Sequence, residues 1–252
     1  MTLPPNVPQF AADLGEATPV DRAVLEDIAI ANRILAHQGV VDAFGHVSLR
    51  HPSRPDRYLL ARNMAPGSVT ADDIIEFDID SNPVNASGRG IYLERFIHGE
   101  IYRARPDVHS VAHSHSPSVV PFSVVPSVPL RCICHMSGFL GTRVPNFDIR
   151  SCAGDATSLL ITSREIGRVL AETLGEGFAV LMRGHGSTVC AKSLKLAVYR
   201  AVYTEVNAKI QAQAQQIGPV EFMTAGEAAA AMASTESQVD RPWNLWKQAV
   251  LF

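Results

Sequence analysis

The segment VHSVAHSHSPSVV, residues 108–120, places His113 and His115 inside an apolar run rich in β-branched residues. Such a composition is typical of a buried strand. Residues two apart in a strand point to the same face, roughly 6.6 Å from each other at ~3.3 Å per residue. Two imidazoles so placed can converge on one metal ion. The alternative is a pair of core histidines, each with hydrogen-bond partners.

Helices and strands are predicted on both sides of this strand. Helical spacing favours helices over residues 21–39, 92–105, 163–175 and 193–218, with Asp21 and Ser193 as N-caps and Gly39 and Gly175 as stops. A Pro/Ser/Asp turn between residues 47–50 and 57–61 predicts a hairpin, and residues 74–83 repeat the pattern. Residues 178–191 read as one further strand. Because βαβ alternation is absent, the pattern favours one α/β domain with a mixed or antiparallel sheet.

The boundaries of the chain's parts follow from composition. Residues 1–20 are Pro-rich and aperiodic, which predicts an extended arm. Residues 21–232 carry the periodic pattern of one folded domain, and residues 233–252 form a C-terminal tail with both tryptophans, Trp243 and Trp246. These tryptophans either pack on the folded domain or close over a functional site.

Composition excludes several classes of function. The chain has 252 residues and a formal net charge of −3, so it offers no basic surface for nucleic acid. No apolar run reaches the roughly 18 residues of a membrane span, and the N-terminus lacks the pattern of a secretion signal. The 4 cysteines are irregularly spaced, unlike a disulfide framework. We therefore expect a cytoplasmic protein without a nucleic-acid or membrane partner.

A third histidine, His185, lies between Gly184 and Gly186 at the end of an apolar run. Flanking glycines let the backbone approach closely where a side chain must reach a crowded site. Alone, the pattern also fits a turn histidine. With His113 and His115 it makes an open three-histidine metal site, with positions left for water or substrate.

Glu94 lies on the helix that precedes the His113 strand. Its carboxylate can be a fourth ligand or a general acid/base beside a metal, or an ordinary surface glutamate. His98 lies on the same helical face as Glu94. It is expected to contact the metal-binding residues or to face solvent, rather than to bind the metal itself.

Three segments together resemble the class II aldolase/adducin family: GHVSLR (45–50), the stretch at 92–117 and the stretch at 181–211. The acidic residue, the His-x-His pair and the Gly-His-Gly occur in the family's order and spacing, and the resemblance spans about residues 20–230. It implies a single-domain α/β/α sandwich with a mixed, largely antiparallel sheet of the nine-stranded type. It also implies one divalent metal ion per subunit on His113, His115 and His185, Glu94 as the proton-handling carboxylate, and a homotetramer with sites at subunit interfaces.

Departures from the family pattern concern the phosphate-binding elements of its sugar-phosphate enzymes. His46 replaces the asparagine of a Gly-Asn-Val-Ser loop, ARNMAPGSV (61–69) replaces a Thr-Gly turn, and Tyr92 and Leu93 replace two serines. Leucine and tyrosine lack the small hydroxyl donors that hold a phosphate dianion. The substrate is therefore not expected to be a sugar phosphate.

The replacements are more basic and aromatic, which suggests an aromatic acid as substrate. We expect His46, Arg62, Asn63 and Tyr92 to bind it, with Arg62 as the carboxylate clamp because its planar guanidinium matches a carboxylate. Arg89 is a further basic residue of this set. His135, in CICHMSGFLG (132–141), is a second candidate proton donor beside Glu94.

The expected activity is that of a metal-dependent carbon–carbon lyase, as in the branch of the family that decarboxylates hydroxylated aromatic or heteroaromatic acids. Two other enzymatic activities remain as alternatives: an aldolase acting on a non-phosphorylated hydroxy-keto acid and an Fe(II)-dependent oxygenase acting on a hydroxyaromatic substrate. An adducin-like scaffold is disfavoured because unused buried imidazoles each need a partner. Ligand type leaves Zn, Mn, Fe and Co undistinguished.

Overall fold

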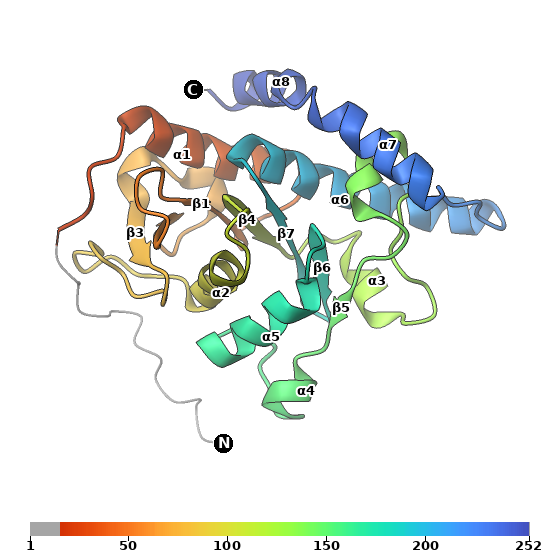
Figure 1. The fold of residues 1–252 in the computed structure, drawn as a ribbon, viewed down its shortest axis with the longest axis horizontal. Helices are drawn as coiled ribbons and strands as arrows, with labels where there is room; N and C mark the ends of the chain where they lie inside the picture. The colour runs from red at the N-terminus through yellow and green to blue at the C-terminus, as the bar shows by residue number, and fades with distance from the viewer. Residues whose placement is uncertain (1–15, 252) are drawn as a thin grey trace.

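A seven-stranded sheet between two helical layers forms the body of the protein (Figure 1). The computed structural model describes residues 16–251. The strand order is β3-β2-β1-β4-β7-β6-β5, and every neighbouring pair is antiparallel except β5 and β6. The strands are β1 (His46–Arg50), β2 (Arg57–Ala61), β3 (Ile74–Asp78), β4 (Ser110–Ser114), β5 (Asn146–Phe147), β6 (Ala179–Met182) and β7 (Gly186–Ala191).

Helices cover both faces of the sheet, which confirms the α/β/α sandwich. Helices α1 and α6 pack on one face, and α2 and α5 pack on the other (Figure 1). The helices are α1 (Arg22–His37), α2 (Phe96–Ala104), α3 (Val120–Val124), α4 (Arg150–Ala153), α5 (Arg164–Leu174), α6 (Leu194–Ile217), α7 (Ala225–Glu236) and α8 (Asp240–Val250), with short 3₁₀ turns η1 (Pro66–Ser68), η2 (Ala71–Asp73), η3 (Leu93–Arg95) and η4 (His135–Leu140).

The predicted helix ends agree with the structure. Asp21 caps α1 by accepting from the Ala23 amide, and Ser193 caps α6 by accepting from the Leu196 amide. Gly175 ends α5 with φ +55°, a conformation that glycine adopts without strain. These short-range signals fix where each helix begins or ends.

Two predicted strand features were wrong. Residues 178–191 form a hairpin of two strands, β6 and β7, because Gly184 turns the chain at φ +67°. The described residues also form seven strands rather than nine. After β3 the chain returns beside it but makes a single bridge, Phe77 to Pro83, and proline has no N–H with which to extend a ladder.

The two ends of the described chain pack on the body. The Thr18 amide and hydroxyl both donate to the Glu76 carboxylate of β3, so residues 16–20 of the predicted arm lie along the sheet edge. Residues 1–15 of that arm lie outside the described residues. At the other end, residue 232 falls inside α7, and Trp243 and Trp246 of α8 are buried against the chain's own helices. Among residues 16–251, no helix combines the length and hydrophobicity needed to cross a bilayer.

Candidate metal centre

The end of β4 carries the first two histidines of the site. The strand lies in the middle of the sheet, between β1 and β7, and His113 pairs with His46 on one side and with Thr188 on the other. His113 is 1% exposed. His115 follows just beyond the end of β4, at the position expected from the two-residue repeat of a strand.

His185 reaches these two residues from the turn of the β6–β7 hairpin. Gly186 makes this possible: a Cβ atom at that position would lie 2.0 Å from the Ser114 carbonyl oxygen. Only a glycine lets β7 approach the end of β4 so closely. The turn therefore sets His185 directly over the His-x-His pair.

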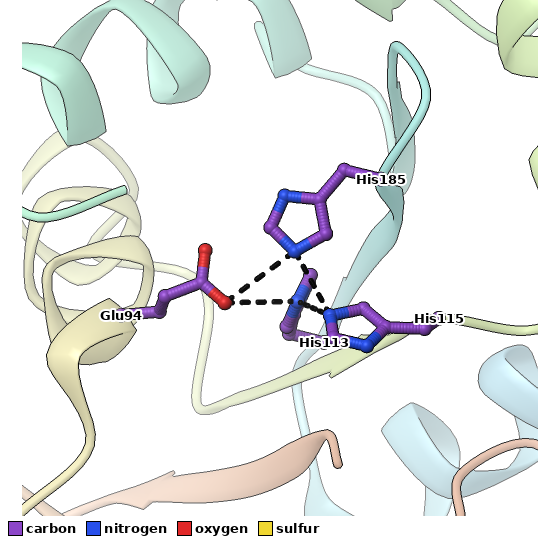
Figure 2. A group of neighbouring side chains, drawn as sticks. All are labelled: Glu94, His113, His115 and His185. Carbon is purple, nitrogen blue, oxygen red and sulfur yellow. Dashed lines mark hydrogen bonds and ion pairs between the residues drawn. The ribbon is translucent and has the colours of Figure 1, made fainter. Parts of the chain in front are cut away.

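Glu94 completes a compact cluster with the three histidines (Figure 2). The His115 Nε2 atom lies 3.1 Å from His113 Nε2 and 2.9 Å from His185 Nε2. Glu94 Oε2 lies 3.6 Å from His113 Nε2 and 3.4 Å from His185 Nε2. Two ligands about 2.1 Å from one ion in a tetrahedral arrangement are separated by roughly 3.4 Å, so these spacings match a shared metal ion.

Hydrogen bonds behind the cluster orient two of the rings. His113 Nδ1 lies 3.1 Å from the Ser187 carbonyl oxygen, and His185 Nδ1 lies 2.9 Å from the Leu159 carbonyl oxygen. A carbonyl only accepts, so each Nδ1 is the donor. In the neutral ring the Nε2 lone pair then faces the cluster, which is the arrangement usual for metal-binding histidines.

Glu94 enters the cluster from a kink between η3 and α2, where its backbone is non-helical (φ −88°, ψ 16°). Its Oε1 accepts from the Ile161 amide at 3.0 Å, so Oε2 is left to face the histidines. Burial alone would raise the pKa of Glu94, but hydrogen bonds and charge from His113 and His185 hold it well below the usual range. The carboxylate is therefore ionised and suited to a cation.

Protonation of the histidines depends on the same contacts. Burial lowers the pKa of His115 to about 4, so this ring is neutral and free to bind a metal. Burial also acts to lower the pKa of His185, but the neighbouring Glu94 carboxylate raises it overall. Acid protonates this ring more readily than an ordinary histidine, so a fall in pH is expected to weaken metal binding.

A pocket of about 430 Å³ opens beside the cluster. Three of the predicted substrate-binding residues, His46, Asn63 and Tyr92, lie in its wall together with Glu94 and His115. The complete set of lining residues contains no lysine, arginine, serine or threonine: Ala43, Phe44, Gly45, His46, Asn63, Met64, Ala65, Tyr92, Leu93, Glu94, His115 and Leu160. The described chain thus offers this pocket none of the groups that usually hold a phosphate.

The two predicted arginines do not line this pocket. Arg62 pairs with Asp73, with 2.6 Å between Nε and Oδ1. Arg89 donates to the backbone carbonyls of Asp72, Ile74, Asn85 and Ala86. Arg89 therefore stabilises the backbone of a loop. Arg62 can bind a substrate only if it breaks its ion pair with Asp73 or keeps that ion pair while it also contacts the substrate.

His135 lies apart from the cluster in the same chain. It is exposed on η4 and lines a separate cavity of about 660 Å³ with residues of α6, α7 and α8, among them Tyr199 and Trp246. The structure therefore brings together the three histidines, Glu94, His46, Asn63 and Tyr92, but not His135.

Sequence analysis left the role of His98 open and did not identify Ser48 as its partner. The His98 Nε2 atom bonds to His46 Nδ1 at 2.7 Å, and His98 Nδ1 bonds to Ser48 Oγ at 2.6 Å. His98 is fully buried, which excludes the solvent-facing alternative. Its position four residues after Glu94 was the signal for a supporting role, but no pattern pointed to Ser48.

Comparison with known proteins shows the family of the chain. Residues 26–212 match the family described as the class II aldolase and adducin N-terminal domain. A relative named decarboxylase tropJ, from Talaromyces stipitatus, is 40% identical over 240 residues, which cover 86% of this chain and 90% of the relative. A 3,4-dihydroxyphthalate decarboxylase from Arthrobacter keyseri is 31% identical over 207 residues, covering 77% and 79% of the two chains.

A solved structure shows the same fold. The aldolase II superfamily protein from Pseudomonas syringae superimposes with a TM-score of 0.75 at 24% identity, covering 93% of this chain and 94% of the other. At that identity the likeness shows the fold alone.

Proposed function

The chain is a lyase-like enzyme of the class II aldolase and adducin family, and from that premise we propose that it decarboxylates a hydroxylated aromatic or heteroaromatic acid without oxidation. The observation that carries the proposal is the pocket beside the Glu94–histidine cluster. It is apolar and aromatic, and its described walls lack phosphate-binding groups. Its volume of about 430 Å³ suits a small aromatic acid.

The metal part of the proposal assigns one divalent ion per subunit to His113, His115 and His185. The three nitrogens and the Glu94 carboxylate have suitable spacing and donor type for Zn, Mn, Fe or Co. When bound, such an ion supplies Lewis acidity toward the phenolate and carboxylate oxygens of the substrate. Glu94 is then either a further ligand or the acid/base group.

Proton handling falls first to Glu94 in this proposal. It is ionised before substrate arrives, so it can accept the phenolic proton of the incoming acid. It then returns that proton to the ring carbon that carried the carboxylate. The ring carbon gains a hydrogen as its bond to the carboxylate breaks, and CO₂ leaves, which balances the reaction.

His135 can take part only if the enzyme is an oligomer. Because His135 lies outside the pocket of its own chain, we propose that it reaches the pocket of a neighbouring subunit within a homotetramer, as the second proton donor. The described cysteines are all free, which suits the reducing cytoplasm proposed for this enzyme.

An oxygen-free product screen tests the function. Metal-loaded protein is incubated with ortho-hydroxylated phthalates and hydroxypyridine dicarboxylates, and release of CO₂ is followed by mass spectrometry. We expect CO₂ from at least one acid, with none from the His113→Ala variant treated in the same way. Turnover that needs air and Fe(II) would instead identify an oxygenase, and an aldehyde product from a hydroxy-keto acid would identify an aldolase.

A further inference from the structure

Four buried polar side chains form one hydrogen-bonded chain that ends at the pocket. His46 Nδ1 bonds to His98 Nε2 at 2.7 Å, His98 Nδ1 bonds to Ser48 Oγ at 2.6 Å, and Ser48 Oγ bonds to Tyr102 Oη at 2.6 Å. All four residues are at most 3% exposed. His46 alone among them lines the pocket.

The direction of this chain follows from counting protons. A buried neutral imidazole carries one N–H, and each hydroxyl carries one O–H. His98 and Ser48 each have a partner on both sides, so each must donate on one side and accept on the other. Only two arrangements remain: all donors point toward His46, or all point toward Tyr102.

Tyr102 selects between the two arrangements. If the donors pointed toward Tyr102, its own buried O–H would need an acceptor, and within residues 16–251 the only hydrogen bond of this hydroxyl is the one to Ser48. A buried tyrosine O–H left without an acceptor is costly. The tyrosine therefore donates to Ser48, Ser48 donates to His98, and His98 donates to His46 Nδ1.

We propose that His46 presents an Nε2–H donor to the pocket and that Tyr102, Ser48 and His98 are positioning residues that fix this tautomer. Its ring lies 5.2 Å from that of His113 and 4.5 Å from that of Tyr92, centroid to centroid. The donor thus lies beside the candidate metal centre. It binds an anionic oxygen of the substrate that the metal does not hold, an assignment of ligand that rests on the proposed function.

The need for such a donor comes from the pocket itself. Its described walls contain no arginine or lysine, so a second carboxylate on the substrate would otherwise lack a strong partner there. A fixed N–H donor in a largely apolar pocket binds an anion without the cost of orienting a flexible side chain. The reverse tautomer would offer a lone pair and repel that anion.

The tautomer can be read directly in Zn²⁺-loaded protein with ¹⁵N-labelled histidine. Two-bond ¹⁵N–¹H correlations distinguish a protonated ring nitrogen from a bare one, and the His46 signals are assigned by their loss in His46→Leu. We expect protonated Nε2 and bare Nδ1 on His46. The opposite pattern in the wild-type protein would overturn the proposal, whatever reaction the enzyme catalyses.

Ser48→Ala tests whether the hydroxyl chain fixes the tautomer. Without the serine, the Tyr102 proton no longer reaches His98, so neither direction is preferred and His46 should become a mixture of tautomers. Ser110→Ala is the matched control, because Ser110 is an equally buried serine that donates to the Ser48 backbone carbonyl instead. Equal spectra for the two variants would contradict the role of Ser48.

Phthalate and benzoate serve as ligand probes, since neither has the hydroxyl that the proposed chemistry needs. We expect wild-type protein to bind phthalate more tightly by calorimetry, and His46→Leu to lose roughly 10- to 100-fold of that preference. Ser48→Ala should lose at least about twofold, because the donor tautomer is then only part of the population. If phthalate and benzoate bind wild-type protein equally, the assignment of the ligand is wrong even where decarboxylation is observed.

Discussion

The imidazole of His98 lies fully buried between Ser48 and His46, and burial, reinforced by the charge of nearby His113, lowers its pKa to about 3. An unfolded histidine has a pKa near 6.5. Between these two values the unfolded chain binds a proton that the folded chain does not. The free energy of unfolding therefore rises with pH across this window, and stability is lost as the pH falls below about 6.5.

We predict that metal-free protein loses unfolding free energy through His98 alone as the pH drops below about 6.5, with a slope that approaches about 1.4 kcal/mol per pH unit near pH 5. His98→Gln keeps a polar side chain but cannot titrate, so its stability should fall less steeply, by that amount. Urea unfolding at several pH values measures both slopes. Parallel slopes for the variant and the wild type would show that His98 does not contribute.

The metal ligands define a second prediction at the level of single residues. His113→Ala should reduce Zn²⁺ affinity beyond the roughly 10- to 100-fold that loss of an outer hydrogen-bond partner costs. His109→Ala is the control, because His109 precedes the same strand but is exposed and outside the cluster. Competition with a chromogenic chelator measures the affinities. If the His113 variant retains full affinity, the cluster is not the metal site.

Among the helices and strands, the β6–β7 hairpin is a feature that the sequence did not predict. Caps such as Asp21 and Ser193 are local signals, and the same-face placement of His113 and His115 follows from strand geometry, so these features were predictable. The turn at Gly184 was not, because an apolar run containing glycine fits one long strand as well as a hairpin. The pairing of Arg62 with Asp73 depends on tertiary placement, which no spacing encodes.

Gly186→Ala tests what the hairpin does for the site. The added Cβ would meet the Ser114 carbonyl oxygen at 2.0 Å and push β7 away from β4. We expect a loss of about 1–3 kcal/mol in unfolding free energy, typical of overpacking, together with weaker metal binding as His185 shifts. Gly218→Ala, in open space on extended backbone, should change neither quantity. Thermal unfolding and metal titration of both variants decide the matter.

At the scale of the whole molecule, the separation of His135 from the cluster leads to a prediction that tests the proposed homotetramer. We predict that His113→Ala and His135→Ala, each nearly inactive alone, regain about a quarter of wild-type activity when co-expressed, because a random mixture lets one site draw its two halves from different chains. His113→Ala with His185→Ala is the control, since both changes damage the same half. Failure of the first mixture to recover activity would place His135 outside the reaction.

Helix α8 closes over α1, and Lys247 forms an ion pair with Asp27, 220 residues earlier in the chain. During synthesis α1 leaves the ribosome among the first elements, yet the partner that covers it is made last of the described helices. Contacts this distant in sequence slow folding and prolong the exposure of apolar surface. We therefore expect the face of α1 that α8 covers to stay exposed until α8 is made, and a chain that ends before α8 should be prone to aggregate.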